Sequence, residues 1–257
     1  MKIIFSDFDG TLLQKRETEI NKNIKKSIYS VLDNGDVFAV SSGRTYVELK
    51  HFFKEFENDI YFIANDGSLV VYREKTLYHL PVEKEIFKDF KSFTAHGKYV
   101  TYIKTPNSIL IRKVMKEYRN HVMQIDSITD INEPIYKVSD YDKTVMCPLP
   151  VVYTNPDMNE YISEHANKGN ASEFLINELK IKRENSYAFG DNINDLEMFD
   201  ACATSYAVAN ALPKVKKHAT KITNNIEHEF LKISHGRNRI WNFSTLKKYP
   251  KAQELTF

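Results

Sequence analysis

The chain has few cysteines and no long apolar run, and both absences narrow the class of protein. Only two of its 257 residues are cysteine, Cys147 and Cys202, and neither has a metal-ligand partner nearby in the sequence. We therefore predict two reduced thiols in apolar surroundings. No apolar stretch approaches the roughly 18 residues of a membrane span, and Asp7 and Asp9 interrupt the apolar stretch near the N-terminus. The sequence thus predicts a cytoplasmic protein without a membrane partner.

Charge of one sign is not in excess either. The chain has 36 Lys and Arg residues against 34 Asp and Glu residues, a formal net charge of +2. This near balance gives no electrostatic case for nucleic acid, so we expect no such partner. No internal repeat or low-complexity segment stands out. The 42% of apolar residues can fill a full core, and the length suits one large domain or two smaller ones.

The most informative segment begins at Ile3, where an apolar run leads into Asp7, Asp9 and Gly10. The i, i+2 spacing places both carboxylates on one side of a strand end, and Gly10 lets the chain turn away from the sheet. In an open parallel sheet, ligands bind beyond the carboxyl ends of the strands. Two like charges held together favour a shared proton or a bound cation. The alternative is a pair of acids in an exposed turn.

Strand-like and helix-like patterns alternate along much of the chain, as expected for a parallel sheet wrapped by helices. Asn21 is expected to cap a helix that ends at Asn34, and the apolar run that follows predicts a strand over 37–41. The same alternation predicts further elements over 46–56, 60–64, 169–179, 187–190, 206–208 and 225–233. The predicted fold class is therefore α/β, with a Rossmann-like parallel sheet.

The character of the sequence changes between about Leu69 and Asn159. Short β-rich runs alternate there with helix-like segments over 83–95 and 111–118, and no catalytic motif falls among them. We predict an inserted smaller α+β cap domain over residues 79–158, with the core domain formed by residues 1–78 and 159–257. The chain is expected to return to the main sheet near Tyr161, and the basic residues after Ser234 predict a solvated tail.

Four motifs resemble, in order, those of the haloacid dehalogenase superfamily, and in particular its Cof-type sugar-phosphate phosphatases. The resemblance spans residues 2 to about 211 and implies the fold of that superfamily, with its cap between the second and third motifs. The motifs are Asp7-Phe8-Asp9-Gly10-Thr11, Ser41-Ser42-Gly43-Arg44, Asn167-Lys168-Gly169 and Gly190-Asp191-Asn192-Ile193-Asn194-Asp195.

The resemblance also implies catalytic roles. Asp7 would attack phosphorus and form an aspartyl-phosphate, and Asp9 would protonate the leaving oxygen and later deprotonate the attacking water. Lys168 would offset the negative charge of the phosphoryl group. Ser42, with Ser41 as the competing choice, would donate a hydrogen bond to a phosphoryl oxygen.

A metal site and a set of substrate contacts follow from the same resemblance. Mg²⁺ would be held by Asp7, the backbone carbonyl of Asp9 and Asp191. Asp195 would either hold the waters of the metal or orient Lys168. The expected substrate contacts are Gly43, Arg44, Asp66 and Asn194.

Each supporting motif has a simpler interpretation when taken alone. Ser42 would then be a helix N-cap, Lys168 a surface lysine and the fourth motif a capped turn. Their common placement just past strands or at helix starts favours the functional interpretation. Asp66 departs from the usual Asn-Gly-Ala of the family, and it would either select a substrate with hydroxyl groups or serve only the turn.

The sequence therefore predicts a Mg²⁺-dependent phosphatase acting on a small phosphorylated metabolite, a sugar phosphate in particular, as a monomer or homodimer. A phosphomutase of the same superfamily is an alternative, but Arg73 and Arg112 do not obviously make the paired arginine cluster it would need. A dehalogenase would need neither Asp9 nor a cation. A phosphate-binding regulator without turnover would need no nucleophile.

Overall fold

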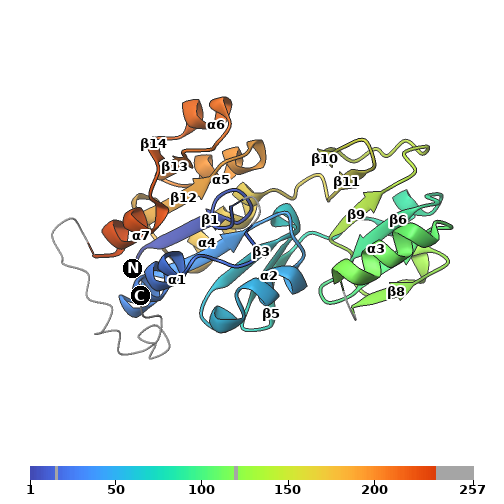
Figure 1. Ribbon diagram of the computed structural model, residues 1–257, viewed down its shortest axis with the longest axis horizontal. Helices are drawn as coiled ribbons and strands as arrows, with labels where there is room; N and C mark the ends of the chain where they lie inside the picture. Colours follow the sequence, from blue (N-terminus) through green and yellow to red (C-terminus); the bar gives the residue numbers. More distant parts are fainter. Residues whose placement is uncertain (15–16, 119–120, 236–257) are drawn as a thin grey trace.

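The larger of two sheets forms the centre of the molecule. The computed structural model describes residues 1–14, 17–118 and 121–235 (Figure 1). Eight strands follow the order β14-β13-β12-β1-β2-β3-β4-β5. β1 (Ile3–Asp7) pairs in parallel with β2 (Val37–Ser41) on one side and with β12 (Ser186–Gly190) on the other. These strands are largely apolar because both faces of the sheet are covered.

The pairing turns antiparallel at one edge of this sheet. β3 (Tyr61–Ala64) is parallel to β2, whereas β4 (Leu69–Tyr72) and β5 (Lys75–His79) are antiparallel to their neighbours. At the other edge β13 (Thr204–Val208) and β14 (Lys221–Thr223) continue in parallel. The sheet is therefore mixed, and the β-rich run at Leu69 belongs to it rather than to the inserted region.

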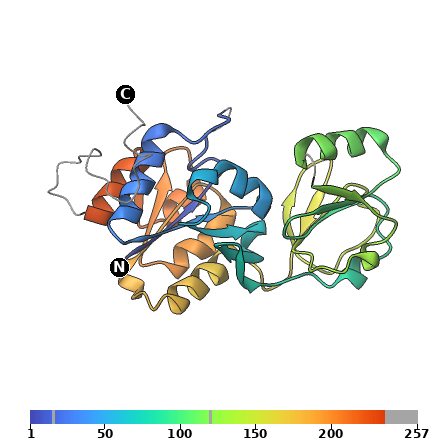
Figure 2. The same cartoon turned by 90° about the horizontal axis from the view of Figure 1, so that it is seen from below.

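Helices cover both faces of the larger sheet. α1 (Lys22–Asp33) packs beside α7 (Ile226–His235) on one face, and α4 (Lys168–Glu178) packs beside α5 (Leu196–Ala201) on the other (Figure 2). Asn21 caps α1 as predicted, since its side chain accepts the N–H of Asn23. The same domain also contains α2 (Tyr46–Phe52), α6 (Pro213–His218) and 3₁₀ turns at 54–56, 65–67, 183–185 and 193–195.

The smaller sheet belongs to an inserted α+β domain with a core of its own. Its order is β10-β11-β9-β6-β7-β8, antiparallel except between β7 and β8. The predicted fold class, an α/β core with a smaller inserted domain, is confirmed. The elements of the inserted domain are a 3₁₀ turn (Lys84–Phe87), β6 (Phe93–His96), β7 (Thr101–Lys104), α3 (Ser108–Tyr118), β8 (Val122–Gln124), a second 3₁₀ turn (Ile128–Asp130), β9 (Lys137–Asp140), β10 (Val151–Thr154) and β11 (Asn159–Tyr161).

Two sequence expectations in this region are wrong. The sequence predicts a helix over 83–95, but the segment forms a 3₁₀ turn at Lys84–Phe87 and then β6. Its phenylalanines fill the core of the inserted domain, so their spacing reflects burial rather than a helical face. Tyr161 does not return to the main sheet, because β11 pairs with β9 and β10. β11 therefore places residues 159–161 in the inserted domain, past the limit predicted at 158/159. The limit at 78/79 stays a prediction, and the basic tail lies outside the described residues.

Both cysteines are free thiols at apolar positions. Cys202 is buried in the core of the larger sheet, and burial raises the pKa of its thiol to about 12. Cys147 is half-buried against the core of the inserted domain. Within the described ranges, no helix is both long and apolar enough to cross a membrane.

Gly67 and Gly35 both have a positive φ angle, 95° and 78°. Substitution should nevertheless destabilise the protein far more at Gly67 than at Gly35. A Cβ at Gly67 would collide with the backbone of Asn167 and Lys168, whereas nothing lies within 4 Å of a Cβ at Gly35. In urea titrations we expect Gly67→Ala to lower the free energy of unfolding by about 3 kcal/mol, and Gly35→Ala by about 1 kcal/mol. Equal losses would show that the packing against the Lys168 segment contributes nothing.

Candidate active site

The four motifs meet where neighbouring strands of the larger sheet end. Asp7 is the last residue of β1, Ser41 is the last residue of β2, Asp66 follows β3 and Asp191 follows β12. The carboxyl ends of parallel strands share one edge of the sheet, which is where ligands bind in open α/β sheets. Lys168, at the first position of α4, completes the group.

Lys168 lies at the centre of this group. Its side chain is fully buried, and its ammonium donates to Asp7 Oδ1 and to Asp195 Oδ1, each at 2.6 Å. Burial alone would lower the pKa of this lysine, but the carboxylates of Asp195 and Asp7 raise it, so the side chain stays charged. The interpretation of Lys168 as a surface residue is wrong.

Asp195 joins the lysine to the fourth motif. Its second oxygen, Oδ2, accepts the backbone N–H groups of Asp191 at 2.9 Å and Asn192 at 3.0 Å. Asn192 caps the 3₁₀ turn at 193–195, so this motif is a capped turn as well as part of the site. Of the two roles expected for Asp195, the structure shows the contact with Lys168.

The carboxylates of the site outnumber its cation. Oxygen atoms of Asp7, Asp191 and Asp195 lie within 4.8 Å of one another, whereas the one ammonium group of Lys168 bonds only Asp7 and Asp195. Burial raises the pKa of Asp7, and Asp195 and Asp191 raise it further, while Lys168 offsets only part of this effect. Burial and the charge of Asp195 also raise the pKa of Asp191. The site therefore holds excess negative charge that favours a bound cation.

One oxygen of Asp7 fits such a cation. Asp7 Oδ2 is buried and has no hydrogen-bond partner among the residues the structure describes. Buried polar atoms normally have a partner, so an unpartnered carboxylate oxygen beside two more acids points to a ligand. Hard divalent cations such as Mg²⁺ take oxygen ligands of this kind. Thr11 of the first motif, for which the sequence predicted no role, donates to Asp191 Oδ1 at 3.2 Å.

Asp9 lies outside this carboxylate cluster. β1 ends at Asp7, so Asp9 falls in the turn beyond the strand, and its half-exposed carboxylate accepts two N–H groups of Arg44 at 2.7 and 2.8 Å. Phe8 is fully buried between the two acids, with its ring 4.9 Å from that of Phe52. The Arg44 guanidinium lies over both rings. The interpretation as an exposed turn thus applies to Asp9 and not to buried Asp7.

Both candidate hydroxyls lie at the end of β2. Ser41 pairs in register with Asp7, and its buried Oγ has no hydrogen-bond partner in the described part of the chain. Ser42 Oγ accepts the backbone N–H of Arg44 at 3.2 Å, so its own proton can be donated elsewhere. Ser42 is not the N-cap of α2, because Thr45 fills that position.

Three of the residues expected to contact substrate lie together. Asn194 Nδ2 donates to Asp66 Oδ1 at 2.9 Å, and Asp66 is buried with a φ angle of 54°. Gly43 lies against the same carboxylate, since a Cβ there would crowd Asp66 Oδ2. The fourth, Arg44, instead contacts Asp9. Contact of these residues with a substrate stays a prediction.

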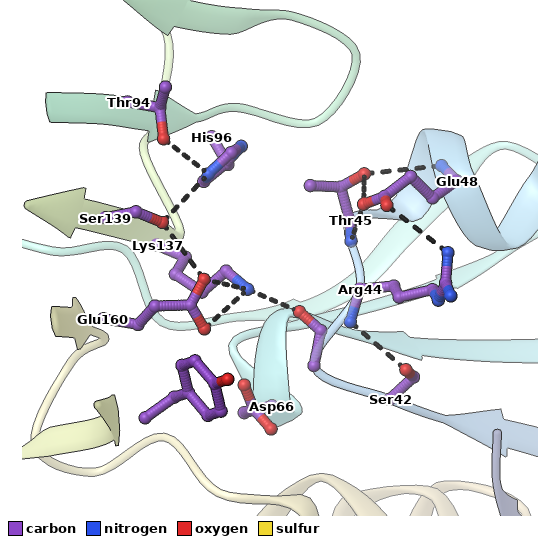
Figure 3. Close-up of polar contacts among 12 residues, drawn as sticks. Ser42, Arg44, Thr45, Glu48, Asp66, Thr94, His96, Lys137, Ser139 and Glu160 are labelled. Atoms are coloured by element: carbon purple, nitrogen blue, oxygen red, sulfur yellow. Dashed lines mark hydrogen bonds and ion pairs between the residues drawn. The ribbon is translucent and has the colours of Figure 1, made fainter. Parts of the chain in front are cut away.

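Sequence reasoning missed two charged residues beside the site. Lys137 of β9 is buried, and its ammonium donates to the Gly43 carbonyl at 2.6 Å (Figure 3). Glu160 of β11 pairs with that ammonium at 3.2 Å. Both lie in the inserted domain, outside every motif. The only signal in the sequence was a lysine within the short β-rich run at 136–139, and a single charged residue there predicts no chemistry.

Comparison with known proteins identifies the family. Residues 4–147 and 107–229 match the family model of the haloacid dehalogenase-like hydrolases. The chain belongs to this family. Its fold is also that of the HAD subclass IIB sugar phosphatase BT4131, with a TM-score of 0.74 at 19% identity over 89% of this chain and 97% of that protein.

Two relatives of this hydrolase are named for different substrates. Phosphoglycolate phosphatase 1 of Saccharolobus solfataricus is 27% identical over 88% of this chain and 90% of the relative. The 5-amino-6-(5-phospho-D-ribitylamino)uracil phosphatase YbjI of Escherichia coli is 24% identical over 82% of this chain and 86% of the relative. Their common feature is a phosphate ester, and the group that carries it differs.

Lys168→Met should destabilise the hydrolase in a pH-dependent way. The folded-state pKa of Asp7 is raised, so this carboxyl contributes stability at low pH that is lost as the pH rises through the folded-state pKa. Without the ammonium of Lys168 that pKa rises further. We expect the variant to lose about 3–5 kcal/mol of unfolding free energy near neutral pH and less near pH 5.

Urea unfolding in EDTA at the two pH values measures this difference. Lys182→Met is the matched control, because the Lys182 side chain is 80% exposed. We expect the control to change the unfolding free energy by less than about 0.5 kcal/mol. A loss for Lys168→Met that is equal at both pH values would contradict the charge balance described above.

Proposed function

We propose that the hydrolase is a Mg²⁺-dependent phosphatase that cleaves a small phosphorylated metabolite, a sugar phosphate in particular, through an aspartyl-phosphate. The buried triad of Asp7, Lys168 and Asp195 carries this proposal. An anionic phosphate can approach an anionic nucleophile only where positive charge offsets the repulsion, and a buried lysine on the nucleophile supplies it. The phosphatase names of the relatives support the proposal.

In this proposal Asp7 attacks phosphorus. Lys168 fixes one of its oxygens, so the carboxylate is held in a single orientation at the end of β1. Attack would form a bond from an Asp7 oxygen to phosphorus while the bond from phosphorus to the leaving alcohol breaks. Water would then attack the same phosphorus, release inorganic phosphate and regenerate the Asp7 carboxylate. Ser42 would hold a phosphoryl oxygen through its free proton.

In this proposal Asp9 transfers the proton. It would give a proton to the leaving oxygen and take one back from the attacking water. Arg44 donates two N–H groups to the ionised Asp9 carboxylate, and its guanidinium lies against Phe8 and Phe52, so Asp9 must leave this ion pair before it can carry the proton that it donates. The partial exposure of Asp9 lets it meet an alcohol that enters from solvent. Its position in the turn beyond β1 thus separates proton transfer from nucleophilic attack.

The metal requirement is part of the proposal. Asp7, Asp191 and the backbone carbonyl of Asp9 would hold Mg²⁺, and Asp195 would orient Lys168 and the fourth motif beside it. When bound, the ion supplies charge neutralisation and orientation of the phosphate. The unpartnered Asp7 Oδ2 and the excess of carboxylates support this donor set.

The alternatives receive less support. A mutase would need a second phosphate site, yet Arg73 donates to the Asn58 carbonyl and Arg112 is exposed on α3. A regulator that only binds phosphate would need no buried nucleophile. The polar cluster of Asp66 and Asn194 and the sugar phosphatase BT4131 favour a polyhydroxylated substrate. Cytoplasmic location, the monomeric or homodimeric state and the absence of nucleic-acid partners stay predictions of the sequence.

Phosphate release from p-nitrophenyl phosphate and a panel of sugar phosphates tests the function. We expect turnover with Mg²⁺, none with EDTA, and a loss in kcat of more than about a thousandfold for Asp7→Asn. Asp89→Asn, at an exposed position of the inserted domain, is the matched control. Activity retained by Asp7→Asn would remove Asp7 as nucleophile. No turnover by folded wild type on any substrate would favour a mutase or a binding protein.

Asp9→Asn should slow the reaction according to the leaving group. An alkyl oxygen needs a proton to leave, whereas p-nitrophenolate leaves without one. We therefore expect a loss in kcat of about 100-fold or more on a sugar phosphate and a clearly smaller loss on p-nitrophenyl phosphate. Losses of equal size on both substrates would count against Asp9 as the acid.

A further inference from the structure

We propose that Lys137 of the inserted domain is a positioning residue for the hydroxyl of Ser42, acting through the peptide group that joins Gly43 to Arg44. The proposal rests on the function proposed above, in which Ser42 binds a phosphoryl oxygen. It assigns to the inserted domain a part in building the phosphate site itself.

The contacts form a relay of two hydrogen bonds across one peptide group. The Lys137 ammonium donates to the carbonyl oxygen of Gly43 at 2.6 Å, and the N–H of Arg44 donates to Ser42 Oγ at 3.2 Å (Figure 3). This carbonyl and this N–H belong to the same planar peptide group. A cation on the carbonyl polarises the group and strengthens the hydrogen bond made by its N–H.

The relay directs the proton of Ser42. Because Ser42 Oγ accepts the Arg44 N–H, its own O–H must point to a different acceptor. Ser42 lies at the end of β2, beside the strand that ends in Asp7. A phosphoryl group on Asp7 would be the acceptor at this edge of the sheet. The hydroxyl proton is thus directed away from the Arg44 peptide before the phosphate arrives.

Lys137 is itself held in place from the inserted domain. Glu160 pairs with its ammonium at 3.2 Å, and Ser139 Oγ donates to Glu160 Oε1 at 3.1 Å. Ser139 also contacts His96 Nε2 at 3.4 Å, which continues the network to β6 (Figure 3). Burial and the charge of Lys137 lower the pKa of His96, so the imidazole adds no positive charge here. The charge of the Lys137 ammonium is therefore balanced by nearby carboxylates.

The charges around Lys137 keep it ionised. Burial alone would lower its pKa, but Glu160, Asp66 and Glu48 raise it. Asp66 and Glu48 come from the main domain, so the ammonium is stabilised only where both domains face it. A buried ion pair by itself adds little net stability. The contact with Gly43, which crosses from one domain to the other, is what a purely structural pair within the inserted domain would not need.

A double-mutant cycle on the binding of inorganic phosphate tests the relay without turnover. Isothermal titration calorimetry with Mg²⁺ should show about tenfold weaker binding for Lys137→Met than for wild type. In the Ser42→Ala background the same change should weaken binding by less than about twofold, because the relay then has no hydroxyl to set. In the Ser41→Ala background the tenfold effect should persist.

The test needs a control variant and a replacement variant. Lys88→Met changes a lysine of the inserted domain whose side chain is 58% exposed, and its phosphate affinity should equal that of wild type. If Lys137→Met does not fold, Lys137→Met with Glu160→Gln replaces it in every background, because that pair buries no unpartnered charge. The Glu160→Gln single variant is then the reference for the cycle.

The outcomes separate this inference from the proposed function. An equal loss of affinity in the wild-type and Ser42→Ala backgrounds would overturn the relay, as would an effect that disappears in Ser41→Ala instead. Wild type that binds phosphate but hydrolyses no ester would remove the phosphatase proposal and leave the relay to be judged by the cycle. Wild type that binds no phosphate with Mg²⁺ would overturn the relay, whereas the phosphatase proposal is judged separately by phosphate release from the ester panel.

Discussion

The ammonium of Lys168, 2.6 Å from both Asp7 and Asp195, is the contact on which the organisation of the site depends. It joins the end of β1 to the start of α4 and to the fourth motif, segments that are far apart in the chain. A buried cation is stable only with close anionic partners, and the two carboxylates in turn need the cation. This mutual requirement holds the edge of the sheet in one arrangement. The backbone packs accordingly, with Gly67 against the peptide that precedes Lys168.

The acidic residues of the site lie in two different environments. Asp7 and Asp195 are buried against the lysine and Asp191 lies partly buried beside them, and together the three carboxylates leave excess negative charge, which suits a divalent cation. Asp9 is kept apart from that cluster by Phe8, whose buried ring fixes the turn between the two acids. The proposed nucleophile and the proposed acid therefore have different surroundings, although one residue separates them in the sequence. Two carboxyl groups can take two roles only when their environments differ in this way.

Local patterns made much of the main domain predictable. The apolar run at Ile3, the cap at Asn21 and the strand ends that carry the motifs depend on nearby residues and on the rule that parallel strands share an edge. The helix predicted over 83–95 failed because its phenylalanines are spaced by the core they fill. Lys137 was missed because its partner Gly43 lies 94 residues away, and no local pattern reports such a contact. The pairing of Asp9 with Arg44 was missed for the same reason.

The identity of the residue that carries the phosphoryl group tests the central claim most directly. Rapid acid quenching of wild-type protein during turnover, followed by peptide mass spectrometry, would locate that group. Our account predicts a phosphoryl group on Asp7, in the peptide that contains Phe8 and Asp9. This phosphoryl group should be lost when the substrate is exhausted. Steady release of phosphate with no phosphorylated peptide, or with the group on a different residue, would contradict the account.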